Sequence, residues 1–234
     1  MYFGLNDPTI ILLIPAILFT IFAQTKVKRA YSRYSQVANR NGMTGMQAAR
    51  MILDHNGMQD VPIEVIPGEL TDNYDPTKDV MHLSEGTAYS NSVAAVSIAA
   101  HESGHAIQDE RNYGFLKFRV AMVPVVNLVS GASWPLLIIG LMVIGFGNIT
   151  TGNMLFNIGV LMFVVVVLFH TVTLPVELNA SRRAILQLQQ LGIIYDDEVT
   201  GAKRVLSAAA MTYVAALATS IVNLLRILII RGRN

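Results

Sequence analysis

The chain has 234 residues, of which 53% are hydrophobic and only 14% are charged, and its formal net charge is +1. This composition excludes an average soluble domain and predicts an integral membrane protein, while the near-neutral charge argues against nucleic-acid binding. Cysteine is absent, which excludes disulfides, thiolate metal sites and a cysteine nucleophile. Any metal must therefore be bound by histidine or carboxylate side chains.

The first apolar segment, Thr9 to Gln24, carries no charge and predicts a membrane anchor within residues 1–25. Pro15 is expected to bend this helix. A cleaved signal peptide is the alternative, but no basic residue precedes the segment and no cleavage site ends it. A basic cluster follows and, by the positive-inside tendency, predicts that the next segment is cytoplasmic. The cluster comprises Lys26, Lys28, Arg29 and Arg33.

Residues 26–119 form the polar part of the chain. Thr44 is a candidate N-cap for a helix that runs toward Ile52. Val61 to Ile66 and Val80 to Ser84 read as short strands of a β-hairpin or small sheet, and Leu70 to Pro76 reads as a loop between them. We interpret the second strand as an edge that could pair with an extended peptide; an ordinary hairpin is the alternative.

The next helix carries the strongest chemical signal in the chain. It is predicted from Ser92 to Gln108, with N-cap candidates among the residues just before Val93. His101 and His105 are four residues apart, so they lie on one helical face and can bind a single tetrahedral ion. In this histidine and glutamate pattern Glu102 is the general base that deprotonates a metal-activated water. A chance match in an amphipathic helix is the alternative.

Residues 120–176 contain no Asp, Glu, Lys or Arg. Their length suits two membrane spans of about 20 residues joined by a turn, which we place at Gly147 to Asn153. Pro124, Gly131 or Trp134-Pro135 could divide the first span from an interfacial segment. A hairpin returns the chain to the side that it left. We therefore expect the two histidines and the first charge after the hairpin, Glu177, to face the same compartment.

Residues 177–204 again contain basic side chains and are predicted to be cytoplasmic. Val205 to Leu225 is a further uncharged run, so residues 205–234 are predicted to form a C-terminal membrane helix and tail. A full crossing would leave Arg231 and Arg233 outside, against the positive-inside tendency. This helix could instead lie along the interface, and the fold prediction is a mostly α protein with three to four membrane helices.

A catalytic zinc site needs a third protein ligand, and Glu177 is the strongest candidate. Its alternative interpretation is a carboxylate at the N-terminus of a new helix that begins after Pro175. His82 and the acids from Asp72 to Asp79 are the remaining candidate ligands. We interpret His55 and His82 as ordinary surface or strand histidines.

The residues His101-Glu102-Ser103-Gly104-His105, followed after the hairpin by Glu177-Leu178-Asn179-Ala180-Ser181-Arg182-Arg183, resemble the membrane-bound neutral zinc metallopeptidases of the YugP-like family. The chain is more distantly similar to the HtpX-like and CAAX prenyl endopeptidases. The resemblance implies a zincin-like (gluzincin) metal helix, one zinc ion per chain held by His101, His105 and Glu177, and Glu102 as the general base. Ser181 departs from the distant families, which have Asp there to support a ligand histidine.

Peptide hydrolysis also needs a group that stabilises the oxyanion. We favour Tyr213, because a tyrosine hydroxyl in a helix of small residues requires a partner. His170, Arg182 and Arg183 are the alternatives.

The sequence therefore predicts a zinc-dependent membrane-bound endopeptidase that hydrolyses peptide bonds with a metal-activated water. Its site is expected at the cytoplasmic face of a bacterial cell membrane, and its expected partners are the lipid bilayer and a peptide or membrane-protein substrate. A site-2-type intramembrane protease is one rival, but it would need Asp in the later spans. A non-enzymatic scaffold or chaperone-like protein with a structural or vestigial metal site is the other.

Overall fold

The computed structural model describes residues 8–232, so residues 1–7 of the predicted anchor, and Arg233, lie outside the described part. The chain divides into two compact units. The sheet unit comprises Ala23–Lys117 and Pro175–Thr212. The span unit comprises Phe118–Leu174, the residues up to Phe22 and those from Tyr213 onward. The domain boundaries predicted from the sequence stay predictions.

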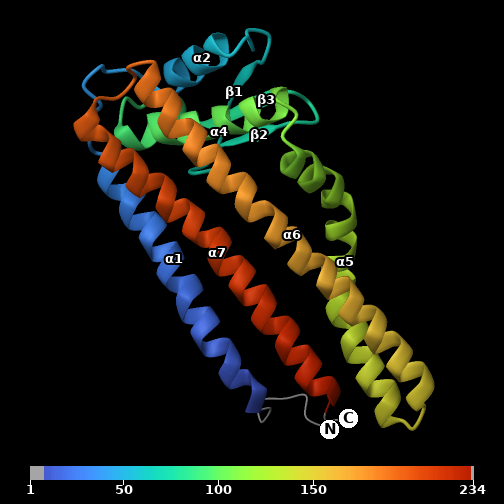
Figure 1. The fold of residues 1–234 in the computed structure, drawn as a ribbon. Coiled ribbons are helices and arrows are strands. Elements are labelled where there is room, and N and C mark those ends of the chain that lie inside the picture. The colour runs from blue at the N-terminus through green and yellow to red at the C-terminus, as the bar shows by residue number, and fades with distance from the viewer. Residues whose placement is uncertain (1–7, 233–234) are drawn as a thin grey trace. The chain divides into compact units, whose positions relative to one another are not determined.

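The described elements are mostly helices, and Figure 1 labels them in chain order. The helices are a 3-10 turn at Pro8–Leu12, α1 Leu13–Tyr34, α2 Gly45–His55, α3 Glu85–Ala88, α4 Val93–Glu110, α5 Gly114–Gly145, α6 Ile149–Gln190 and α7 Asp196–Gly232. The strands are β1 Ile63–Ile66, β2 Asn73–Asp75 and β3 Val80–Ser84.

The strands form one sheet in the order β1-β3-β2, in which β1 is parallel and β2 antiparallel to β3. Two expectations are therefore wrong. β3 is the central strand and has no free edge, and β2 lies within the segment that we expected to be a loop. Two of the three residues of β2, Asn73 and Asp75, are turn-forming types, and the strand depends on backbone pairing with β3 that leaves no pattern in the sequence.

Helices α2 and α4 begin where local side-chain chemistry predicts. Thr44 caps α2 in a capping box with Gln47, and Ser92 caps α4 by accepting a hydrogen bond from the Ala95 backbone. Between these caps and the sheet lies the larger apolar core of the described residues, to which α4 contributes Val93, Val96 and Ile107. Because α4 is buried along most of its length, it is a rigid central element of this unit.

The chain contains four helices that are long and apolar enough to cross a membrane, judged by length and composition among the described residues. They are α5, α6, α7 and the helix from Thr9 to Tyr34, in agreement with the predicted three to four membrane helices. Figure 1 shows α5 and α6 side by side within the span unit. Their close approach uses glycine, since a Cβ atom on Gly140 would lie 2.7 Å from the Phe156 nitrogen.

The helices are longer and more continuous than the sequence predicts. α5 contains Pro124 and Pro135 in its interior, and α6 continues through Pro175. The turn between α5 and α6 occupies only residues 146–148, where Gly147 has a positive φ of 93°, so most of the predicted turn is helical. α7 already begins at Asp196. Pro15 lies in the first turn of α1, where a proline is tolerated.

Candidate metal centre

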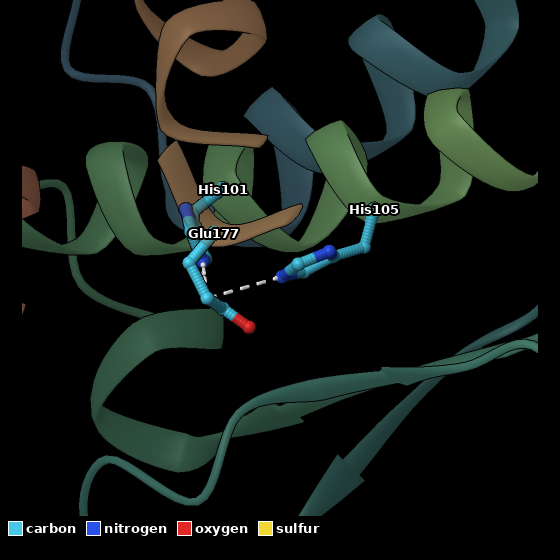
Figure 2. Close-up of side chains that lie close together, drawn as sticks. All are labelled: His101, His105 and Glu177. Carbon is cyan, nitrogen blue, oxygen red and sulfur yellow. Dashed lines mark hydrogen bonds and ion pairs between the residues drawn. The ribbon is translucent and has the colours of Figure 1, made fainter. Parts of the chain in front are cut away.

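Helix α4 and the part of α6 that belongs to the sheet unit bring three potential metal ligands together. His101 and His105 lie one turn apart on α4, and Glu177 lies on α6. Figure 2 shows both imidazole rings beside the Glu177 carboxylate, whose Oε2 lies 3.2 Å from His101 Nε2 and 3.6 Å from His105 Nε2. Ligand atoms of the three residues all lie within 4.8 Å of one another. These residues could hold a metal ion.

The donor set and its spacing fit zinc. Two imidazole nitrogens and one carboxylate oxygen are ligands that Zn²⁺ takes in catalytic sites. With bonds of about 2.05 Å and tetrahedral angles, two donor atoms lie about 3.3 Å apart. The distances of 3.2 and 3.6 Å from Glu177 Oε2 to the imidazole nitrogens bracket this value. Three protein donors to a tetrahedral ion would leave one position for a water molecule.

The placement of Glu177 excludes the alternative interpretation that it is a carboxylate at the N-terminus of a new helix. Because α6 is continuous from Ile149, Glu177 lies inside a helix and not at the N-terminus of a new one. The residue is only 1% exposed, so its carboxylate lies beside the two imidazoles away from bulk solvent. Burial of a carboxylate is costly without a positive or hydrogen-bonding partner. The two imidazole groups beside the Glu177 carboxylate therefore account for its buried position.

Glu102 is 8% exposed and lies next to the histidine pair on α4. Its Oε2 accepts a 3.1 Å hydrogen bond from the backbone N–H of Tyr74 in β2. Burial raises the pKa of Glu102 to about 7, an effect that the nearby His101 opposes and the Glu177 charge reinforces. A carboxyl with a pKa near neutrality can both take up and release a proton.

Both candidate ligand histidines are also held through their second ring nitrogen. Ser181 Oγ lies 3.2 Å from His101 Nδ1, so the residue that departs from the distant families still contacts a candidate ligand histidine. Gln108 Oε1 lies 3.1 Å from His105 Nδ1. Sequence reasoning missed Gln108 and the Tyr74 backbone contact. The contact of Gln108 with His105 could have been predicted from its position three residues after His105 on the same helix.

The other candidates from the sequence have different surroundings. His55 is exposed at the end of α2, and His82 on β3 contacts Asn73 and Glu64, as expected for a surface or strand histidine. Arg183 donates to Asn179, while Tyr213 and His170 lie in the span unit. Among residues 8–232, the group of potential ligands that the structure brings together is that of His101, His105 and Glu177, and it does not include His82 or the acids from Asp72 to Asp79.

Comparison with known proteins is consistent with this centre. A family model described as "Putative neutral zinc metallopeptidase" matches residues 9–232. The chain is 46% identical over 227 residues to a protein of Bacillus subtilis (strain 168) described as "Putative membrane protease YugP", with 96% of this chain and 98% of that protein covered. No solved structure matches the chain. Because both matches extend over nearly its whole length, the chain belongs to the family described as "Putative neutral zinc metallopeptidase".

Proposed function

We propose that this protein is a zinc-dependent membrane endopeptidase of the zincin-like (gluzincin) type, with one zinc ion per chain. The observation that carries the proposal is the convergence of His101, His105 and Glu177 beside a buried carboxyl, Glu102. The two histidines and Glu102 form the pattern found in metalloproteases, and the position of Glu177 beside the histidines supports its assignment as the third ligand.

A bound zinc ion would supply the Lewis acidity that activates water toward a peptide carbonyl. Glu102 is the group that takes the proton from the attacking water and returns it to the departing amine. The Tyr74 N–H holds one oxygen of Glu102 and leaves the other for this proton. Tyr213 stays our proposal for the group that stabilises the oxyanion.

We further propose that the site acts at the cytoplasmic face of a bacterial plasma membrane, on extended peptides from membrane or membrane-near proteins. The basic cluster after the first apolar segment supports this orientation. The substrate class is supported by the third ligand, since Glu177 follows directly on the apolar hairpin. A site joined to membrane helices in this way favours substrates that are themselves near the bilayer.

Replacement of Glu102 by glutamine tests the proposal. Glu102→Gln removes the proton acceptor but no metal ligand, so peptidase activity of the purified full chain should fall by about 10²–10⁴-fold while zinc remains bound at one ion per chain. Activity is measured on a peptide library, and zinc by elemental analysis. Chelation should abolish the wild-type activity, and added zinc should restore it.

Glu110→Gln is the matched control, because Glu110 lies exposed at the end of the same helix. It should retain full activity. Equal cleavage by wild type and Glu102→Gln would contradict the catalytic role of Glu102, whereas zinc binding without any cleavage by the wild type would favour the scaffold alternative.

A further inference from the structure

Gln108 is fully buried one turn after His105 on α4, at a position that the histidine and glutamate motif does not specify. Its side chain contacts both of the helices that carry metal ligands. Oε1 lies 3.1 Å from His105 Nδ1, while Nε2 donates to the Val176 carbonyl at 2.8 Å and to Asn179 Oδ1 at 3.0 Å. Gln108 therefore connects His105 to the backbone beside Glu177.

The partners of Gln108 fix the direction of its amide group. Arg183 Nε donates to Asn179 Oδ1 at 2.8 Å, and because a guanidinium only donates, the Asn179 atom at this position must be the oxygen. The Gln108 atom that faces this oxygen and the Val176 carbonyl must then be the NH₂ group. This leaves Oε1 of Gln108 toward His105.

The direction of the amide in turn fixes the tautomer of His105. A carbonyl oxygen only accepts hydrogen bonds, so the neutral imidazole must carry its proton on Nδ1. Its lone pair is then on Nε2, the atom that lies 3.6 Å from Glu177 Oε2. The partner of His101 differs, because the hydroxyl of Ser181 can donate or accept and is compatible with either tautomer.

We propose that Gln108 is a positioning residue of the metal centre. Its carbonyl oxygen holds His105 in the tautomer that presents Nε2 to the metal, and its NH₂ group ties α4 to the α6 backbone next to Glu177. The proposal rests on the metal site of the proposed function, but it does not require peptidase activity. Supporting partners of ligand histidines typically change metal affinity by about 10–100-fold when they are removed.

The test compares zinc dissociation constants of full-length variants in detergent, measured by competition with a chromogenic chelator. Gln108→Met has a similar size but neither hydrogen-bonding group, and it should bind zinc about 10–100-fold more weakly than wild type. Gln108→Glu keeps an acceptor for His105 Nδ1 but lacks the NH₂ group, and its second carboxylate oxygen would face the Val176 carbonyl and Asn179 Oδ1, so it should also bind zinc more weakly than wild type. Visible absorption of the cobalt-substituted protein should change in Gln108→Met, because the ligand field at the metal changes.

Gln187→Met is the matched control. Gln187 lies on α6 and accepts a hydrogen bond from Asn56, the residue that follows α2, but no hydrogen bond joins it to His101, His105 or Glu177. Its zinc affinity and cobalt spectrum should match wild type. Wild-type affinity in Gln108→Met, or equal losses in both methionine variants, would overturn the proposal. Tight zinc binding by a wild-type protein without peptidase activity would contradict the proposed enzyme and leave the role of Gln108 standing.

Discussion

At the scale of single residues, Gly104 determines how closely the two ligand-bearing helices approach. A Cβ atom at this position would lie 2.6 Å from the Ala180 carbonyl oxygen, well inside van der Waals contact. That oxygen belongs to the backbone of α6 and cannot rotate away as a side chain would. Because Ala180 is about one turn beyond Glu177, the missing side chain of Gly104 sets the distance between the histidines and the third ligand.

We expect Gly104→Ala to push α6 away from α4, at a cost in unfolding free energy of about 1–3 kcal/mol from overpacking. Glu177 would then be displaced from both histidines, and zinc affinity should fall at least tenfold, as measured by chelator competition. Gly114→Ala is the control, since a Cβ atom at the start of α5 meets nothing within 4 Å. Unchanged zinc affinity in Gly104→Ala would show that the contact between the helices does not position the site.

The sequence predicts those site residues whose side-chain type and spacing alone indicate metal binding. Histidines four apart with an adjacent glutamate are informative before any fold is known, and Glu177 follows from its place after an uncharged hairpin. The contact of Tyr74 with Glu102 was not predictable, because it uses a backbone N–H that every residue except proline has. Gln108 was missed because a buried glutamine resembles a surface glutamine in sequence.

At the scale of elements, α6 shows why local signals can mislead. A proline inside a helix removes one backbone hydrogen bond and favours a break. Here one face of the helix after Pro175 is fully buried and includes Val176, Ala180 and Ala184. Burial of this face offsets the loss, so the helix continues and Glu177 lies in its interior. Caps were predictable because their bonds join residues only three apart, as with Thr44 and Gln47.

The cap of α2 gives a prediction in which stability and metal binding respond separately. Thr44→Ala removes the acceptor for the Gln47 N–H and should cost about 1 kcal/mol of unfolding free energy. Thermal melting in detergent should show a decrease of about 2–4 °C. Zinc affinity should not change, because Thr44 contacts no ligand. Thr44→Ser keeps the hydroxyl and should melt near the wild-type temperature; an equal loss in Thr44→Ser would contradict the cap.

At the scale of the whole molecule, the main question is the orientation in the membrane. Residues 120–176 carry no formal charge. Basic residues are concentrated at positions 26–33, just after the first apolar segment, and again within residues 177–204, after the uncharged hairpin. The membrane class, the number of apolar helices and the family were predictable because they depend on composition and motif. The strand order was not, since it depends on contacts between residues that are distant in sequence.

The absence of native cysteine makes this orientation directly testable, because any introduced thiol is unique. A membrane-impermeant maleimide added to intact cells should label Asn148→Cys, in the turn between α5 and α6, but not Gln59→Cys in the sheet unit. Both should react after lysis. Labelling of Gln59→Cys alone in intact cells would place the metal centre outside, and equal labelling of both would contradict a full crossing by α5.

The continuity of α6 also imposes an order on biosynthesis. The ribosome releases His101 and His105 first, then the whole of α5, and only afterwards Glu177 with the residues that support the histidines. A nascent chain in which only α4 and α5 have emerged therefore has two of the three ligands and no contact partner for Gly104. Because Glu177 is added only after the apolar hairpin has been synthesised, an unfinished chain cannot hold a metal ion with all three of these residues.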